Sequence, residues 1–593
     1  MFKPYRLARV VAISLLLATG SVAAQPSAIT SEAWTLPTEP GHLAGTLLMP
    51  EGSGPWPVVL ILAGSGPTDR NGNATQFPGG NNSLKQLAEQ LAADGVASLR
   101  VDKRGVAGSV TAVISEYDLR FDHFIADAVS WCEKLQADKR FSSVTVAGHS
   151  QGAQVGMNAA WLSDADGFVS ISGPGRDLFA LLRDQLATSL PVRTRVKAES
   201  VLVELEQGRL VAEPPIELTI LFRPSVQPFL MSWYRHDPVV ELARLAVPVL
   251  VVQGLTDQQV ALEDAEALMG ARPDAHLLLV DGMNHVLKYV AADNAYAQQS
   301  SLVDSTLIIA AKVPAAVADL VREADRGAAA RRAAREAVIT RADGGQRLLA
   351  VADEDSVLAA ESSLPTASRV GRWARRFAAD DDVVYLFGPN DGGYVAEGAI
   401  VSDYRQDCVS LLYRTSELAR ARDARDAVDW ALRTRFAGAT AAAVADGNGR
   451  LDYENPAHLD YSLDMIRTGL WGREMTSLLS GAVVDTVGTS RYPAGSFSYV
   501  PKGQLQAGEL AEGDVVWFVL DAAHESGAKL RQESGLVVGH IGLVVVEDGE
   551  VVLIHAASSD LEGSYQGGTV VQVPLADYLA RVDKFAGVMV TRF

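Results

Sequence analysis

The sequence predicts two domains: an N-terminal α/β domain built on a mostly parallel sheet, and a second domain in which a helix precedes a series of strands. The chain has 593 residues, which is too long for a single hydrophobic core. Its first half alternates short apolar runs with amphipathic segments that are typical of helices. Between Ala311 and Gln346 the composition changes to alanine and arginine, which favours a solvated helix at the join.

Apolar runs mark the strands of the first half. A strand pair is expected at 31–36 and 43–49, and the run 57–63 is of the kind that is buried on both faces of a sheet. Further strands are expected at 96–101, 144–147, 168–172, 248–253 and 276–280, and helices at 83–95 and 121–135. Strands that alternate with helices favour parallel pairing, and the active sites of such sheets lie at the carboxyl ends of the strands.

The stretch Val144-Thr-Val-Ala-Gly-His-Ser-Gln-Gly152 predicts a strand that turns sharply into a helix, with Ser150 at the turn. A serine hydroxyl becomes a good nucleophile when a base removes its proton, and such a turn holds the hydroxyl exposed beside that base. Gly148 and Gly152 flank the serine because side chains there would collide with the crowded backbone. The Gly-x-Ser-x-Gly pattern alone is weakly specific, so its context must support it.

Two later strand ends supply the partners that Ser150 needs. Asp257 follows the strand at 248–253, and His285 follows the strand at 276–280. The order Ser, Asp, His, with each residue just past a strand, predicts that His285 takes the proton of Ser150 while Asp257 holds the imidazole in the right tautomer. Asp281 is also near His285 in the sequence and is the alternative carboxylate.

A glycine-rich loop, Ala63-Gly-Ser-Gly-Pro-Thr-Asp-Arg-Asn-Gly72, follows the strand at 57–63. Its backbone can offer an N–H group, which we assign to Ser65. Together with the N–H of Gln151 it would form an oxyanion hole.

These motifs together resemble the α/β-hydrolase superfamily over about residues 40–300, and in particular its secreted esterases and serine-aminopeptidase-like members. The resemblance rests on the Gly-Ser-Gly-Pro-x-Asp-Arg loop, Asp102-Lys-Arg-Gly105, the turn at Ser150, Gly254-Leu-Thr-Asp257 and Asn284-His285. It implies an α/β-hydrolase fold, a mostly parallel doubly wound sheet with a helical cap. Residues 176–245 fall where that family inserts the cap.

The second half contains another candidate nucleophile. Cys408 opens an apolar helical segment, and a helix N-terminus favours the nucleophilic thiolate. His540 begins one expected strand and His555 ends the next, across a short turn that brings the two rings toward each other. One imidazole can pair with Cys408 while the other orients it. The remaining cysteine, Cys132, lies on an apolar helical pattern and is expected in the core, so we expect two free thiols.

The order of Cys408, His540 and His555 resembles the papain-like NlpC class of bacterial cell-wall peptidases and amidases, over about residues 365–593. The closest likeness is to a subgroup described as N-acetylmuramoyl-L-alanine amidase-like. Its marks here are Asp407-Cys408, Tyr499-Val-Pro-Lys502, Gly513-Asp-Val, His540-Ile-Gly, His555-Ala with Ser558, and Leu575-Ala-Asp-Tyr578. The chain departs from this pattern in the residues after Cys408 and in a spacer between Asp521 and Gly535. The resemblance implies an α+β papain-like cysteine hydrolase domain that acts on peptidoglycan.

The N-terminus predicts an exported protein. Lys3, Arg6 and Arg9 precede an apolar run and a small-residue cleavage site, Val22-Ala-Ala24, which is typical of a secretory signal. The apolar run is too short to span a bilayer, so we expect no stable membrane insertion. The formal net charge of −20 argues against nucleic acid as a partner.

We therefore expect a signal peptide at 1–24, a hydrolase domain at 25–305, a helical linker at 306–365 and the papain-like domain at 366–593. The expected function is that of a periplasmic or extracellular bifunctional hydrolase, with a serine esterase and a cysteine amidase or peptidase acting on peptidoglycan fragments. Neither site needs a metal or an organic cofactor. The alternative is a single secreted serine esterase or aminopeptidase whose C-terminal domain only binds cell-wall fragments. The sequence does not define the oligomeric state.

Overall fold

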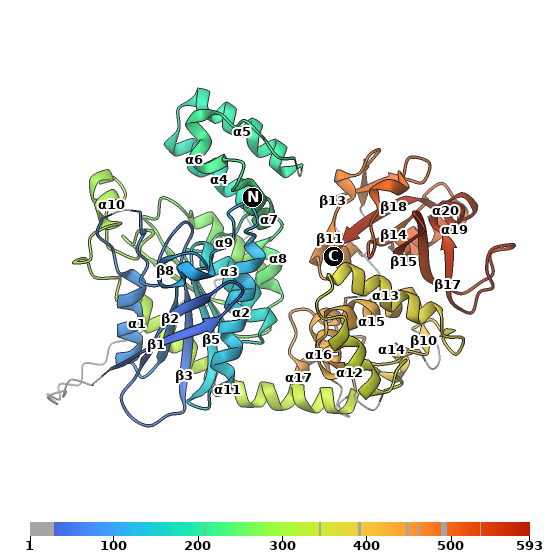
Figure 1. Ribbon diagram of the computed structural model, residues 1–593, viewed down its shortest axis with the longest axis horizontal. Coiled ribbons are helices and arrows are strands. Elements are labelled where there is room, and N and C mark those ends of the chain that lie inside the picture. Colours follow the sequence, from blue (N-terminus) through green and yellow to red (C-terminus); the bar gives the residue numbers. More distant parts are fainter. Residues whose placement is uncertain are drawn as a thin grey trace, which may run out of the picture. The chain divides into compact units, whose positions relative to one another are not determined.

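The computed structural model describes residues 29–593 except 77, 208, 343–344, 389–392, 446–449, 460–462, 488–494 and 534. The expected signal peptide lies outside the described residues. The chain divides into two compact units, with the division between Ala330 and Arg331. Each unit is described by itself below (Figure 1).

The N-terminal unit is built on one eight-stranded sheet with the order β1-β2-β4-β3-β5-β6-β7-β8. The strands β3 to β8 pair in parallel, whereas β1 and β2 form an antiparallel edge. Their bounds are Thr30–Pro37 (β1), His42–Met49 (β2), Trp56–Leu62 (β3), Ala97–Val101 (β4), Phe141–His149 (β5), Gly167–Ile171 (β6), Val249–Gly254 (β7) and His276–Val280 (β8). The prediction of a mostly parallel sheet is confirmed.

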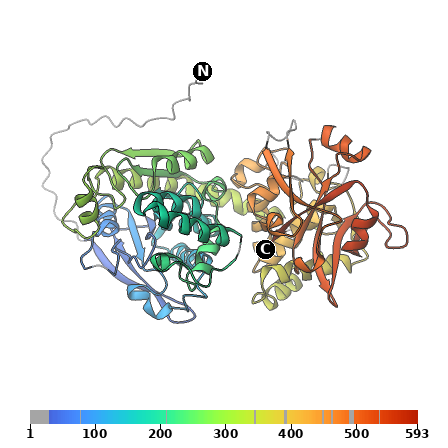
Figure 2. The same ribbon diagram turned by 90° about the horizontal axis from the view of Figure 1, so that it is seen from above.

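The sheet is covered on both faces because its central strands are apolar on both sides. Along β3, Val58 and Leu60 belong to one hydrophobic cluster, and Val59 and Ile61 belong to the other. Neighbouring side chains of a strand point to opposite faces, so this alternation fills two layers. Helices α2 (Phe121–Ala137) and α3 (Gln151–Leu162) pack on the first face, and α1 (Ser83–Ala93) packs on the second (Figures 1 and 2).

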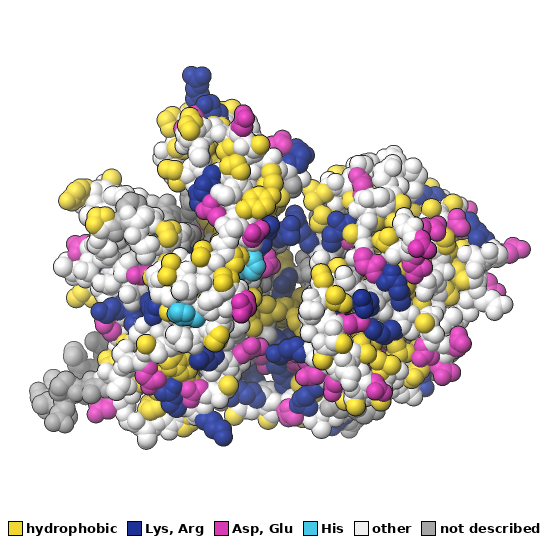
Figure 3. Space-filling model, in the orientation of Figure 1, with side chains coloured by type: hydrophobic (Ala, Val, Ile, Leu, Met, Phe, Trp, Pro, Cys, Tyr) yellow, Lys and Arg dark blue, Asp and Glu magenta, His cyan; other side chains and the backbone are white. Residues whose placement is uncertain are grey.

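A group of helices lies between β6 and β7, in the position expected for the cap. Its members are α4 (Leu178–Ser189), α5 (Val192–Glu206), α6 (Thr219–Phe222), α7 (Gln227–Tyr234) and α8 (Pro238–Ala243). Phe121 of α2 stacks on Trp233 of α7 with ring centroids 5.4 Å apart, which joins the cap to the sheet layer. The outer surface of the cap is apolar in places (Figure 3), since Ile216 and Ile220 are 87% and 91% exposed. Helices α9 (Leu262–Ala271) and α10 (Ala295–Ser301) follow β7 and β8.

Helix α11 (Lys312–Ala342) differs from the solvated linker that its composition suggests. Its first turns are buried in the second cluster of the sheet through Val313, Val317, Leu320 and Val321. Most of the arginines follow these residues in the sequence. The average composition of the segment therefore predicts a solvated helix, although its first half carries an apolar stripe.

The C-terminal unit contains an antiparallel sheet with the order β12-β13-β18-β14-β15-β16-β17 (Figure 2, orange to red). Its strands are β12 (Val483–Val487), β13 (Gly495–Pro501), β14 (Val515–Leu520), β15 (Val538–Glu547), β16 (Glu550–Ala557), β17 (Thr569–Pro574) and β18 (Phe585–Arg592), and the short β11 (Arg473–Glu474) also pairs with β18. Helices α13 (Thr366–Ala378) and α15 (Cys408–Arg420) pack against β15 and β16, and α16 (Ala424–Arg435) packs against α15. The expected spacer after Asp521 forms helix α19 (Glu525–Glu533).

The buried face of α11 generates a prediction about stability. Leu320→Ala should lower the free energy of unfolding of the N-terminal unit by about 2–5 kcal/mol, because a cavity would open against the sheet. Glu323→Ala on the same helix is the control. Its carboxylate is 44% exposed and pairs with the exposed His276, so its loss should cost at most about 1 kcal/mol. Urea unfolding measures both, and equal effects would show that the helix is a solvated linker after all.

Candidate active site

Ser150 lies between the last residue of β5 and the first residue of α3, in a strained backbone conformation. Its φ is +55° and its ψ is −124°, a region that residues with side chains rarely adopt. The Ser150 N–H donates to the carbonyl of Ile171 at the end of β6, at 3.0 Å. The hydrogen bond to β6 therefore holds Ser150 in this strained conformation. The same kind of strand–turn–helix exposes the nucleophilic serine of many hydrolases.

The two flanking glycines are required by close backbone approach. A Cβ atom added to Gly148 would lie 2.1 Å from the carbonyl oxygen of Gly152. A Cβ atom added to Gly152 would lie 2.5 Å from the carbonyl oxygen of Leu62 and 2.7 Å from that of Ala63. A side chain at Gly152 would push the turn away from the end of β3, and one at Gly148 would force the turn itself open.

His285 and Asp257 form a hydrogen-bonded pair at the same edge of the sheet. The Nδ1 atom of His285 lies 2.8 Å from Oδ2 of Asp257, and the aspartate side chain is fully buried. Asp257 Oδ1 also accepts from the backbone N–H groups of Gln259 and Val260. The alternative carboxylate, Asp281, is exposed. The geometry thus leaves Nε2 of His285 as the nitrogen available to a serine proton.

The charge state of Asp257 suits this role. Burial would raise its pKa, but the imidazole of His285 and the two backbone N–H groups hold the pKa below its usual value. The carboxylate therefore stays ionised at neutral pH and can stabilise an imidazolium next to it.

His149 is a residue of this site to which the sequence analysis gave no role. Its Nε2 atom lies 2.7 Å from the backbone carbonyl of His285, and the two rings are 4.8 Å apart. Burial, and then the nearby His285, lower the pKa of His149 to about 4, so the ring is neutral and donates to that carbonyl. It ties the turn at Ser150 to the loop that carries His285. The only signal in the sequence was its position inside Gly-x-Ser-x-Gly.

The glycine-rich loop lies against the nucleophile. A Cβ atom added to Gly64 would lie 3.2 Å from the Cβ of Ser150. Ser65 is exposed, and Gln151 is the first residue of α3. Among the described contacts, neither of their N–H groups donates to a protein acceptor. Both donors predicted for an oxyanion therefore lie near Ser150 with their hydrogen bonds available.

Cys408 is the first residue of α15 in the C-terminal unit. Asp407 caps the helix, since its Oδ1 accepts from the N–H groups of Val409 and Ser410 at 3.0 and 2.8 Å. Strand β15 packs against α15, and the backbone N–H of Ile541 partly opposes the rise in the pKa of the thiol. Cys408 is 6% exposed, and burial together with Asp407 raises the pKa of its thiol. The thiol is therefore neutral in this structure. Cys132 is also buried and free.

His540 and His555 contact each other on adjacent strands. His540 Nε2 lies 2.9 Å from His555 Nδ1, as the short hairpin between β15 and β16 predicts. The ring of Tyr578 lies within 4.8 Å of the His555 ring and 6.1 Å of the His540 ring. Burial lowers the pKa of both histidines, to about 3 for His555, so both rings are neutral. Burial, Tyr565 and Cys408 raise the pKa of Tyr578, whose ring lies beside both imidazoles, so the histidine pair and the thiol border the same tyrosine.

Among the described residues, no group of three or more His, Cys, Asp or Glu side chains is arranged to hold a metal ion. None of the described helices combines the length and apolar character needed to cross a bilayer.

The fold and this constellation define the N-terminal half as an α/β-hydrolase domain, and comparisons with known proteins agree. Residues 58–299 match a family described as Alpha/beta hydrolase family. Esterase EstD of Thermotoga maritima is 32% identical over 250 residues, which are 41% of this chain and 58% of that protein. The chain thus spans little more than half the length of this curated relative.

Solved structures that match part of the chain are less similar in sequence. Est1E from Butyrivibrio proteoclasticus is 17% identical, with a TM-score of 0.33, over 49% of this chain and 98% of that chain. Proline iminopeptidase of Mycobacterium smegmatis is 16% identical, with a TM-score of 0.33, over 50% of this chain and 100% of that chain.

The buried carboxylate predicts how labelling of Ser150 responds to substitution. Asp257→Asn should slow the reaction of Ser150 with a fluorophosphonate probe by about 10⁴-fold, because the imidazole would lose its tautomer and its counter-ion. Asp281→Asn is the matched control and should label at the wild-type rate. The labelling rates of both variants are measured by mass spectrometry. Slow labelling of Asp281→Asn with normal labelling of Asp257→Asn would show that Asp281 is the carboxylate that orients His285.

Proposed function

We propose that the N-terminal domain is a serine hydrolase of carboxylic esters. The observation that carries this proposal is the buried Asp257–His285 pair at the strand ends next to the strained turn of Ser150. The name of the relative from Thermotoga maritima, an esterase, supports an ester as the substrate.

In the proposed mechanism, Ser150 Oγ attacks the ester carbonyl while His285 Nε2 takes the hydroxyl proton. The negative charge on the carbonyl oxygen is stabilised by the N–H groups of Ser65 and Gln151. His285 then returns the proton to the leaving alcohol, which leaves an acyl group on Ser150. Water attacks this acyl group with the same base, and the free acid and the serine are released.

The esterase activity can be tested with a short-chain ester. Wild-type protein should hydrolyse 4-nitrophenyl acetate. Ser150→Ala should lower kcat by at least about 10³-fold, because the nucleophile is lost. Ser130→Ala, at a partly exposed serine on α2, is the control and should keep full activity. Cleavage of aminoacyl 4-nitroanilides without cleavage of short esters would establish the alternative, a serine aminopeptidase.

We further propose that the C-terminal domain is a papain-like cysteine amidase or peptidase. Two features support it, namely the position of Cys408 at the N-terminus of α15, which packs on β15, and the hydrogen bond between His540 and His555. Because burial raises the pKa of the thiol, its proton would pass to His540 during attack rather than before it. His555 would orient the His540 ring, and the Ile541 N–H would stabilise the developing thiolate.

The expected substrate of this second site is an amide bond of peptidoglycan, either the lactyl–L-alanine bond or a bond in the stem peptide. This rests on the resemblance of residues 365–593 to the NlpC class. The proposed location is the periplasm or the extracellular space, where this polymer is accessible, on the basis of the signal-like residues 1–24. The competing proposal is that the domain binds cell-wall fragments without cleaving them.

Selective alkylation separates these two proposals. In a Cys132→Ala background Cys408 is the only thiol, so iodoacetamide reports on it alone. Treatment should abolish the release of new amine ends from purified peptidoglycan, measured by mass spectrometry, and should leave the Ser150-dependent ester hydrolysis unchanged. If no new amine ends appear even before alkylation, the domain does not cleave peptidoglycan, and the proposal that it only binds cell-wall fragments is supported.

A further inference from the structure

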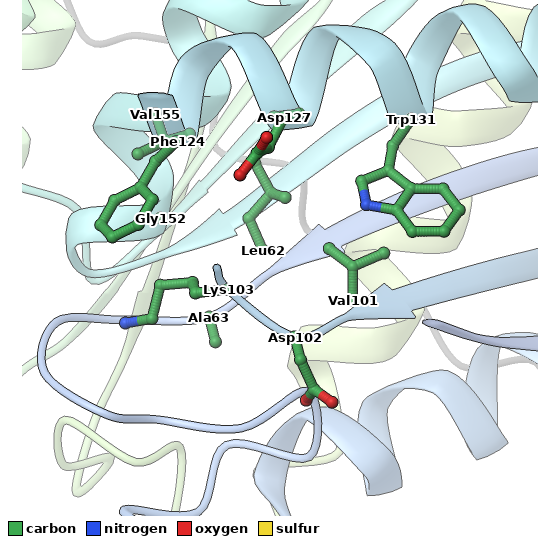
Figure 4. Close-up of a pocket in the computed structure, with 11 residues that line it drawn as sticks. Leu62, Ala63, Val101, Asp102, Lys103, Phe124, Asp127, Trp131, Gly152 and Val155 are labelled. Atoms are coloured by element: carbon green, nitrogen blue, oxygen red, sulfur yellow. The ribbon is translucent and has the colours of Figure 1, made fainter. Parts of the chain in front are cut away.

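Lys103 follows β4 in the motif Asp102-Lys-Arg-Gly105, and the mechanism above gives it no role. Strand β4 pairs in parallel with β3, so the residues that follow the two strands meet at the same edge of the sheet. Lys103 borders a small cavity of about 30 Å³, beneath the glycine-rich loop, together with Leu62, Phe124, Asp127 and Gly152 (Figure 4).

The ammonium of Lys103 is directed at backbone carbonyls rather than at a carboxylate. Its Nζ atom donates to the carbonyl oxygen of Gly64 and, at 2.5 Å, to that of Gly66. Two carboxylates line the same cavity, but Asp102 pairs with Arg70 and Asp127 pairs with Arg104. Figure 4 shows the Lys103 side chain extending away from both of them. Burial lowers the pKa of Lys103 to about 7, and both its charged and its neutral form carry N–H groups for the two carbonyls.

The contact with Gly64 determines the direction of the Ser65 N–H. The carbonyl of Gly64 and the N–H of Ser65 belong to one peptide group. The cis bonds of the described chain are Glu39-Pro40 and Gly54-Pro55, so this peptide is trans. In a trans peptide the C=O and N–H groups point in opposite directions. An ammonium that holds the oxygen on one side therefore fixes the N–H on the other side.

The other hydrogen bonds of this part of the loop are local, since Thr68 donates to the carbonyl oxygens of Ser65 and Gly66. Gly66 has no side chain to pack, and a Cβ atom there, at φ +68°, would meet nothing within 4 Å. The adjoining cavity has room for about one water molecule. The hydrogen bond from Lys103 is therefore the described restraint on the Gly64 carbonyl oxygen. A charge-assisted bond to the Gly64 oxygen also polarises the peptide, which strengthens its N–H as a donor.

We propose that Lys103 is a positioning residue that aims and polarises the Ser65 N–H toward the oxyanion of the tetrahedral adduct that Ser150 forms with the ester. This inference rests on the proposed esterase function of the N-terminal domain. Lys103 itself touches neither the nucleophile nor the reacting carbonyl.

The test compares Lys103→Met, Lys103→Gln and the control Lys85→Met in steady-state hydrolysis of 4-nitrophenyl acetate. Lys85 lies on the surface of α1, is 47% exposed and pairs with Glu89. Lys103→Met should lower kcat by about 10- to 100-fold, less than complete loss of an oxyanion donor, and should leave KM within about twofold of wild type. Lys103→Gln keeps an N–H donor and should recover part of kcat, and Lys85→Met should match wild type.

Two results would overturn the inference. One is an unchanged kcat in Lys103→Met. The other is a loss of kcat that follows a loss of thermal stability and is not recovered by Lys103→Gln, which would make Lys103 merely structural. A failure of the esterase proposal gives a different pattern, because wild-type protein would then show no Ser150-dependent hydrolysis at all, and both proposals would fall together.

Discussion

The close approach of two backbone segments at Ser150 is the constraint on which the N-terminal site depends. Gly152 meets the carbonyl oxygens of Leu62 and Ala63, so the turn at the end of β5 is pressed against the end of β3. The loop that leaves β3 therefore has to pass next to the nucleophile. One steric requirement thus places the serine and the loop that carries the proposed oxyanion donor in a fixed relation.

The two candidate sites differ in the group that lies behind the histidine. His285 has a buried, ionised aspartate behind it, which stabilises the imidazolium as it forms. His540 has a second neutral imidazole behind it, and burial lowers the pKa of both rings. A neutral imidazole orients its neighbour by hydrogen bonding but gives little compensation for a positive charge. The C-terminal site therefore offers less electrostatic stabilisation to a protonated histidine than the N-terminal site does.

The helix that carries Cys408 is anchored by buried charges rather than by apolar packing alone. Arg414 pairs with Asp403, and Glu417 pairs with Arg435, and all four side chains are at most 1% exposed. Removing one member of such a pair leaves an uncompensated buried charge, which typically costs about 3–5 kcal/mol. The register of α15, and with it the position of Cys408, depends on this network.

The sequence by itself determined the strands and main helices of the N-terminal sheet, its parallel pairing, the turn at Ser150 and the order of its partners. These follow from local patterns, since periodicity reports which face of a segment is buried and glycine reports where backbone must come close. The tertiary structure decided what local patterns do not encode. It pairs His285 with Asp257 and leaves Asp281 exposed, it brings His149 to the carbonyl of His285, and it buries the first half of α11. Each of these depends on distances between residues far apart in the chain, and those distances are set by the order of strands in the sheet.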